Sequence, residues 1–277
     1  MGALVSDQQG RARAARSYRL AGIEVGTGAA VLIPLAAVRG PRGRRPRFVY
    51  LLLGVLEPGL SFLLFDVGLS RTSATHAALL LASETLFVVL LARLTLRERM
   101  SPALAVAVGA GFGGAVLVSL EPSGAAASVG GDALLLVASA LAAGYGVLAR
   151  KVAPTGDWLT VTATQLVGAL AVCVPIVAGV SATGHSRCAD AGHILAAVAT
   201  GALASVIPFA LYNAAIARMT ATTATTILTL IPVFGTASAL LLIGGGIGSA
   251  QVLGGALVIT AAATAINLQR GEAPVAS

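Results

Sequence analysis

Four carboxylic acids fall inside long apolar stretches of this sequence, where an ionised side chain is energetically unfavourable. Glu57 and Glu84 lie near the middle of their stretches, and Glu24 and Asp66 lie nearer to an end. An ionised side chain at the centre of a bilayer costs at least about 2.5–3.5 kcal/mol. A carboxyl group that is protonated in one state and ionised in another is also the simplest proton-coupling device. Glu84 and Glu57 are therefore the candidates for proton coupling, whereas Glu24 and Asp66 could reach water by snorkelling.

Both candidate acids also have a structural interpretation. Glu84 could be a protonated acid that hydrogen-bonds to a neighbouring helix. Glu57 precedes Pro58, which removes a backbone donor and bends a helix, so the carboxyl group could serve only the irregular backbone. His76, at the start of the stretch that holds Glu84, is interpreted as a residue of the helix cap rather than a ligand. The sequence leaves both roles open for the two acids.

Hydroxyl side chains form a stripe in a later apolar stretch. Their spacing places them on one face of a helix, at Thr222, Thr225, Thr226, Thr229 and Thr236. Thr226 and Thr229 lie close to Pro232 and would suit the wall of a cavity for a polar ligand. The alternative is that each hydroxyl donates to the carbonyl four residues earlier in its own helix.

Three further polar side chains within apolar stretches are candidates for substrate binding. Gln165 and Asn213 carry amides that can donate and accept hydrogen bonds. Tyr212 could line a cavity or, like Trp158, anchor a helix at the membrane interface. Other chemistry has no basis in the sequence, which shows no metal-ligand cluster, nucleophile triad, CxxC pair or phosphate loop. The sequence therefore predicts neither an enzyme nor a cofactor or metal site.

The composition of the chain indicates what kind of helices must position these residues. The 277 residues are 57% hydrophobic and only 10% charged, against about 25% charged in soluble proteins. The mean hydropathy of +0.91 agrees with a chain whose main partner is the lipid bilayer. A net charge of +7 does not indicate nucleic-acid binding, because the arginines sit in short gaps between apolar runs.

The apolar runs predict an all-α integral membrane protein with nine transmembrane helices, since about 20 residues cross a bilayer. The predicted helices are Leu20–Val38, Phe48–Leu69, Thr75–Leu94, Pro102–Leu120, Gly131–Ala149, Trp158–Val180, His193–Ile216, Thr223–Ile243 and Ala250–Leu268. Residues 1–19 are predicted to be a polar basic N-terminal tail, and 269–277 a C-terminal tail. Small residues at Gly109, Gly113, Gly254 and Gly255 predict close helix packing within the monomer, with a homodimer as the alternative.

An internal repeat divides the chain. Phe65–Arg71 aligns with Tyr212–Arg218 without a gap, because 212 − 65 = 218 − 71 = 147. At the same offset Leu81 meets Leu228, and Glu84 meets Ile231. A fixed internal period in an apolar chain is typical of secondary transporters. The sequence thus predicts a first repeat over 20–120 and a second over 131–268.

The stretch from Ser70 to Pro102 also resembles a known family. Its hydroxyl-alanine turn at Ser73-Ala74, the acid at Glu84 and the basic loop before Ser101 are similar to the EamA domain of the drug/metabolite transporter superfamily. Thr85 replaces the proline of that pattern and Arg97 replaces a glycine, while the second repeat keeps Pro232. The resemblance implies two inverted five-helix repeats, with alternating access around a cavity between them.

This chain departs from the ten-helix family fold, because nothing in residues 1–19 matches the first helix of the second repeat. Either the first helix is absent or the sequence starts too late, and we favour the late start because losing a core helix would open the fold. Basic residues concentrate in alternate connections, at 39–47, 93–101, 150–157, 217–222 and the C-terminal tail. By the positive-inside rule these connections and the C-terminus are predicted to be cytoplasmic.

The resemblance implies a multi-pass exporter in the cell (inner or plasma) membrane that moves small metabolites or drugs. Acids in the first repeat and hydroxyls in the second favour a cationic or zwitterionic substrate that is exchanged for protons. The alternative is a degenerate or partner-dependent membrane protein without transport activity of its own.

Overall fold

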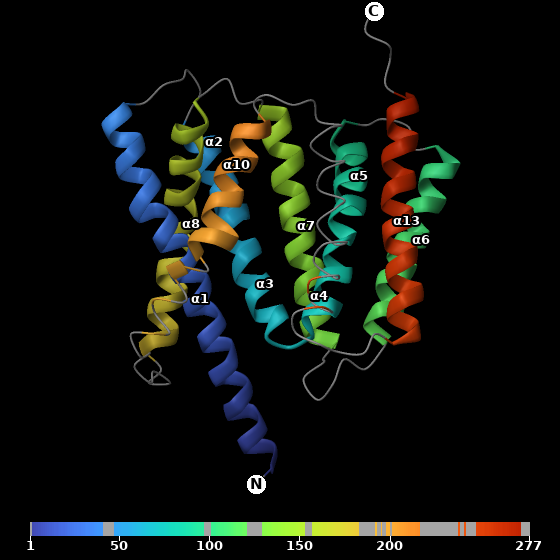
Figure 1. The fold of residues 1–277 in the computed structure, drawn as a ribbon, viewed down its shortest axis with the longest axis horizontal. Coiled ribbons are helices and arrows are strands. Elements are labelled where there is room, and N and C mark those ends of the chain that lie inside the picture. The colour runs from blue at the N-terminus through green and yellow to red at the C-terminus, as the bar shows by residue number, and fades with distance from the viewer. Residues whose placement is uncertain are drawn as a thin grey trace, which may run out of the picture. The chain divides into compact units, whose positions relative to one another are not determined.

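A computed structural model describes residues 2–40, 47–96, 101–120, 129–152, 157–182, 201–216 and 248–272, with a few single positions between 192 and 241. These residues form helices and no strand. The chain divides into two compact units, each made of two separate segments (Figure 1). Unit 1 comprises Met1–Ser70 and Leu148–Arg218, and unit 2 comprises Arg71–Val147 and Met219–Ser277.

The described residues contain 6 helical spans that are long and apolar enough to cross a membrane. They are Ala15–Arg39, Phe48–Leu69, Ala74–Thr95, Val129–Ala149, Trp158–Ala182 and Ser249–Leu268. Two shorter apolar helices, Pro102–Val118 and Gly201–Ala214, fall on further predicted spans. The predicted helix Thr223–Ile243, with Thr226 and Thr229, lies outside the described residues apart from two single positions. The all-α membrane class is therefore supported, whereas the number of nine helices stays a prediction.

Unit 1 begins with α1 (Gly2–Arg39), which is longer than predicted. Its membrane-length part starts at Ala15, and the preceding residues, predicted as a polar tail, are also helical. Alanine, arginine and glutamine are abundant there and are among the strongest helix formers. The helix therefore continues beyond its apolar part, and only the apolar part was visible from hydropathy.

The predicted single helix Phe48–Leu69 is three elements in the structure: α2 (Arg47–Gly54), the π-helix η1 (Val55–Leu60) and α3 (Ser61–Leu69). The interruption lies at Glu57, whose backbone is extended (φ −146, ψ 126), directly before Pro58. Proline has no N–H and clashes with the preceding turn, so it disrupts the α-helical hydrogen-bond ladder.

A second π-helix occupies the matching place in the second repeat. η2 (Gly201–Val206) leads into α10 (Ile207–Ile216), as η1 leads into α3. Adding the repeat offset to the bounds of η1 gives 55 + 147 = 202 and 60 + 147 = 207, within one residue of η2. Two π-helices at equivalent positions support a structural repeat, since such elements are rare.

The remaining helix of unit 1 is α8 (Trp158–Ala182), against which α1 and α2 pack. Glycines permit the contact with α2, because a Cβ at Gly54 or Gly168 would collide with the backbone of the facing helix. The core between α1, α3 and α8 is apolar and includes Val25, Leu63 and Leu166.

Unit 2 contains α4 (Ala74–Leu81), α5 (Ser83–Leu96), α6 (Pro102–Leu120), α7 (Val129–Val152, up to Val147) and α13 (Ser249–Glu272). Ser73 caps α4 by accepting a hydrogen bond from the backbone N–H of His76 (3.1 Å). The predicted helix Thr75–Leu94 is interrupted at Ala82, so α4 and α5 form one membrane-length segment in two parts.

The closest helix pair in unit 2 is α6 and α13, which run side by side (Figure 1). A Cβ on Gly114 would lie 2.6 Å from the carbonyl oxygen of Gly254, and one on Gly254 would lie 2.5 Å from that of Gly114. The predicted role of Gly254 and Gly255 in packing is confirmed. The prediction for Gly109 and Gly113 is wrong, because both are on the exposed face of α6.

The buried faces of α6 and α13 correspond at the repeat offset. Leu104–Val118 maps onto Gln251–Ala265, since 104 + 147 = 251 and 118 + 147 = 265. Buried and exposed positions then coincide along both helices, and only Leu117 and Thr264 differ. The two helices are antiparallel, because Gly114 contacts Gly254 while Leu104 and Ala265 share one cluster.

Candidate functional site

A small pocket in unit 1 combines one acid with apolar and aromatic side chains. It is lined by Glu24, Val25, Leu32, Pro58, Phe62, Leu166 and Phe209, which come from α1, η1, α3, α8 and α10. Pro58 belongs to the interrupted segment, so the break in the helix helps to shape the pocket. The free space inside it is about 10 Å³, room for about one water molecule, so the pocket marks where apolar side chains and a carboxylate converge.

Glu24 is held in the interior of unit 1. Its exposed fraction is 7%, and η2 approaches it so closely that a Cβ on Gly201 would lie 2.8 Å from the Cα of Glu24. Asp66 on α3 is equally buried and lies within electrostatic range of Glu24. The suggestion that both acids reach water by snorkelling is therefore wrong, because neighbouring helices cover both side chains.

The two acids form an acidic corner of unit 1. Asp66 Oδ2 is buried without a hydrogen-bond partner among the described residues. Two carboxylates in such surroundings repel each other, so a proton or a positively charged group of a solute stabilises them. Sequence reasoning named both acids but did not select them, because their proximity depends on the packing of α1 against α3.

Two of the predicted site residues meet directly. The amide nitrogen Nδ2 of Asn213 on α10 donates to Oε1 of Gln165 on α8 over 3.0 Å. Nδ2 also donates to the carbonyl oxygen of Phe209 over 3.2 Å. Both side chains are buried, and their neighbours Leu166 and Phe209 line the pocket. The bond thus fixes α10 against α8 beside the pocket wall.

The other candidates of unit 1 lie on the same elements. Glu57 is half-buried in the extended part of η1, directly before Pro58 of the pocket. Tyr212 is half-buried on α10, next to Asn213 in the chain. Unit 1 therefore gathers Glu57, Gln165, Tyr212 and Asn213 on the helices that form the pocket.

Glu84 belongs to unit 2 and lies at the middle of the membrane-length span Ala74–Thr95, as predicted. It is half-buried in the first turn of α5, just after the interruption at Ala82. The N-terminal turn of a helix favours a negative charge, because its N–H groups lack partners within the helix. The position that looked central by hydropathy is thus a helix start inside the membrane-length segment.

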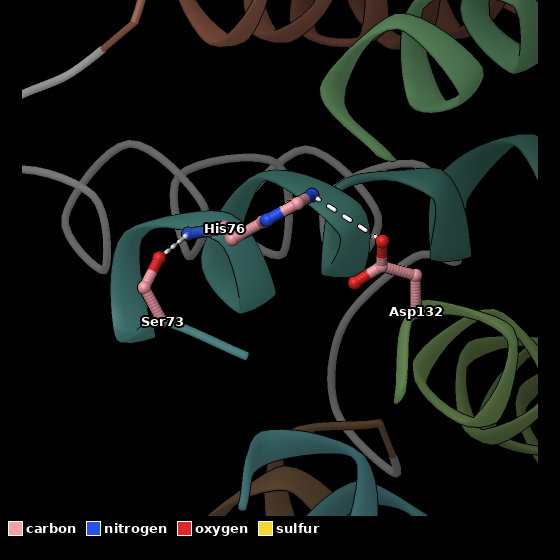
Figure 2. Close-up of polar contacts among 3 residues, drawn as sticks. All are labelled: Ser73, His76 and Asp132. Atoms are coloured by element: carbon pink, nitrogen blue, oxygen red, sulfur yellow. Dashed lines mark hydrogen bonds and ion pairs between the residues drawn. The ribbon is translucent and has the colours of Figure 1, made fainter. Parts of the chain in front are cut away.

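A buried ion pair in unit 2 was missed by sequence reasoning. Nε2 of His76 on α4 lies 3.6 Å from Oδ2 of Asp132 at the start of α7, as Figure 2 shows. The imidazole also hydrogen-bonds to the backbone of Val118 on α6. His76 was interpreted as a cap residue, and its backbone N–H does bind the Ser73 cap. Its ring, however, points into the unit, and no spacing in the sequence links it to an acid 56 residues later (132 − 76 = 56).

No group of three His, Cys, Asp or Glu side chains within the described ranges could hold a metal ion. The buried polar groups within the described residues include acids, one imidazole, amides and hydroxyls. Such groups bind protons and small polar solutes.

The chain is 30% identical over 149 residues to the Uncharacterized transporter YyaM of Bacillus subtilis (strain 168), a match that covers 52% of this chain and 49% of the relative. The match thus spans about half the length of that curated relative. A crystal structure of another protein shares the fold, with a TM-score of 0.62 and 21% identity over 97% of this chain and 94% of that chain.

The family model of the EamA-like transporter family matches twice, over residues 5–120 and 129–267. The two matches agree with the division of the sequence into two repeats. Together they cover most of the chain, which includes both the pocket of unit 1 and the ion pair of unit 2. The chain belongs to the EamA-like transporter family.

Proposed function

We propose that this membrane transporter of the drug/metabolite superfamily exports a small cationic or zwitterionic metabolite or drug in exchange for protons. The observation that carries the proposal is the double family match combined with acids buried in an apolar unit. A transporter with buried acids can exchange a positively charged solute for a proton, because both stabilise the same carboxylates.

The pocket of unit 1 is the proposed place where the substrate binds. Glu24 supplies a negative charge, and Phe62 and Phe209 supply aromatic rings. Cations are attracted to ring faces as well as to carboxylates. The bonded pair Gln165 and Asn213 stands behind the pocket wall and provides amide groups for a polar substrate. An organic cation with an apolar body matches these side chains, and its entry requires the surrounding helices to move apart, because the pocket has room for about one water molecule.

Alternating access between inverted repeats is the proposed mechanism. The equivalent helices α6 and α13 are antiparallel and bury matching faces, which supports an inverted relation. The equivalent π-helices η1 and η2 support it independently. In inverted-repeat transporters the substrate site lies near interrupted helices, as the pocket lies at η1 here.

We assign proton coupling to Glu84. Its repeat equivalent is Ile231, since 84 + 147 = 231, so the acid is not a structural requirement of both repeats. A carboxylate at the middle of the membrane-length span Ala74–Thr95 can titrate between two conformations, in one of which water reaches and stabilises the ionised form. A coupling acid needs such a stabilised ionised state in one conformation.

The test uses purified full-length protein in proteoliposomes with an imposed pH gradient. A panel of organic cations, zwitterionic amino acids and organic anions is offered, and flux is measured at equal protein. Wild type should move cations or zwitterions and not anions. Glu84→Gln should leave expression and thermal stability nearly intact and abolish proton-driven flux, because glutamine keeps hydrogen bonding but does not titrate.

Wild-type flux from Glu84→Gln would remove the coupling role and leave Glu84 as a packing residue. Flux of none of the compounds would support the alternative of a protein that does not transport without a partner. The orientation has a separate test in intact cells, with the C-terminus proposed to be cytoplasmic. Single cysteines within 181–192 should react with a membrane-impermeant label from outside, and those within 39–47 should not.

A further inference from the structure

The His76–Asp132 pair is a polar contact sealed inside unit 2. The exposed fractions of the two side chains are 0% and 4%. The pair joins the first turn of α4 to the first turn of α7, and the backbone of Val118 on α6 hydrogen-bonds to the imidazole. Three helices therefore enclose one imidazole and one carboxylate (Figure 2).

The contact between His76 and Asp132 leaves polar atoms without a hydrogen bond. The 3.6 Å between Nε2 and Oδ2 exceeds hydrogen-bond length, so the attraction is electrostatic and requires a protonated imidazole. Oδ1 of Asp132 is buried and lacks a hydrogen-bond partner among the described residues. Buried polar groups are normally satisfied, and unsatisfied ones mark sites where water, an ion or a proton binds.

Two buried hydroxyls lie further along the same two helices. Ser83 follows His76 by seven residues, and Ser139 follows Asp132 by seven, so each lies about two helical turns beyond the pair. Both serines are buried, and within the described part of the chain neither hydroxyl has a hydrogen-bond partner.

The helix register places the two serines at the same level. At one end His76 meets Asp132, and near the other end a Cβ on Gly144 would lie 3.9 Å from Leu91. The segments α4–α5 and α7 are therefore parallel. Ser83 and Ser139 lie between the His76–Asp132 contact and the Leu91–Gly144 contact. Glu84 is the next residue after Ser83, at the start of α5.

The pair has few charged neighbours. α6 contains no charged residue, and α13 has its charged residues at its C-terminal end. The other described groups of unit 2 that carry charge or titrate, with side chains that the structure places, are Arg71, Glu84, Arg93 and Tyr145. Among the described residues, Asp132 is thus the charged partner of the imidazole, and its carboxylate favours a protonated ring.

We propose that His76 and Asp132 form a proton-binding site, and that the hydroxyls of Ser83 and Ser139 connect this site, through bound water, toward Glu84. The proton binds to the imidazole and is held by the carboxylate. Its release leaves a neutral ring and a carboxylate that binds water. The proposal that the pair binds a proton does not depend on the proposed transport function. The use of that proton in transport does rest on the proposed function.

Nuclear magnetic resonance of the full-length protein with isotope-labelled histidine tests the site without any substrate. The chain has three histidines, so the ring signal of His76 is identified by its loss in His76→Gln. In wild type the signal should change from the imidazolium to the neutral form as the pH rises through the range in which histidines titrate, about pH 5 to pH 8. In Asp132→Asn the ring should stay neutral across this range, because a buried imidazolium needs the carboxylate.

Asp66→Asn is the matched control, since it neutralises an equally buried acid in unit 1. It should leave the His76 titration unchanged. A wild-type ring that does not titrate, or a ring in Asp132→Asn that titrates as in wild type, would overturn the site. The wild-type measurement decides this even if a variant does not fold.

The connection through the hydroxyls has its own readout. Exchange of the His76 ring N–H with water should slow several-fold in Ser83→Ala combined with Ser139→Ala, because the path for bound water loses its polar groups. Ser70→Ala is the control, since that hydroxyl already donates to the carbonyl of Val67 at the end of α3. An unchanged exchange rate would overturn the connection, and absence of transport in proteoliposomes would affect neither result.

Discussion

Unit 1 and unit 2 differ in where their buried polar groups lie and in how their helices pack. In unit 1 the helices are interrupted by η1 and η2, and acids and amides collect around these interruptions. In unit 2 the long helices α6 and α13 pack through small residues, and the described polar contact joins the starts of two helices. The difference agrees with the proposed binding region in unit 1 and with a tightly packed unit 2 that holds the proposed proton site.

The physical reason lies in the backbone. An interrupted helix frees carbonyl and N–H groups, which are tolerated at membrane depth only where protein or a water-filled cavity satisfies them. A close pair of continuous helices has no such groups and can use glycine to approach. The comparison can therefore be tested separately in each unit.

The largest effect is expected from an added methyl group in the α6–α13 contact. In Gly114→Ala the new Cβ would meet the carbonyl oxygen of Gly254 at 2.6 Å and the backbone nitrogen of Val258 at 3.0 Å. Backbone atoms cannot rotate away, so the helices must separate. We expect a loss of about 3 kcal/mol in stability, seen as a lower melting temperature in detergent.

Gly113→Ala is the control on the adjacent residue. No described atom lies within 4 Å of a Cβ at that position. Alanine is a better helix former than glycine, so this variant should be neutral or slightly more stable. Equal melting temperatures for the two variants would contradict the close packing of unit 2.

A smaller effect is expected at the amide pair of unit 1. Asn213→Ala removes the 3.0 Å bond and leaves the buried Gln165 with one partner fewer. Loss of one partner of a buried hydrogen bond costs about 1–2 kcal/mol. A double-mutant cycle with Gln165→Ala should show that the two losses are not additive, in thermal unfolding of the purified protein.

Thr164→Val serves as the control for this pair, because its hydroxyl donates to the carbonyl of Thr160 within α8 at 2.7 Å. Its effect should be close to zero. Additive losses at Asn213 and Gln165 would mean that the bond does not link α8 to α10. Substrate affinity measured on Asn213→Ala then shows whether the amide also binds solute.

Hydropathy was sufficient to find most of the described helices. The predicted bounds Pro102–Leu120 coincide with α6, and Trp158–Val180 falls two residues short of α8. Long apolar runs determine such elements directly, because a bilayer demands their length. The family was also accessible, since Glu84 and the flanking turn and loop are local in the sequence.

Interruptions within the helices and contacts between distant side chains could not be predicted from the sequence. The interruption at Ala82 has no glycine or proline to announce it, and the π-helix η2 lies before Pro208 rather than at it. Hydropathy does not report which hydrogen-bond ladder a helix uses. The meeting of Glu24 with Asp66, and of His76 with Asp132, depends on helix packing between distant parts of the chain, which a periodic pattern does not encode.

The smallest effect is expected from Glu57→Gln, which compares the two acids that are candidates for proton coupling. Glu57 is half-buried in an extended part of η1, and Pro58 beside it already explains the irregular backbone. Glutamine has nearly the same shape and can satisfy the same backbone groups, so stability should change by less than about 0.5 kcal/mol. Proton-driven flux should fall less than in Glu84→Gln, because the coupling charge is assigned to unit 2. Flux that is lost in Glu57→Gln and kept in Glu84→Gln, at equal protein in the membrane, would move the coupling acid to the interrupted helix and make unit 1 the region that binds both substrate and proton.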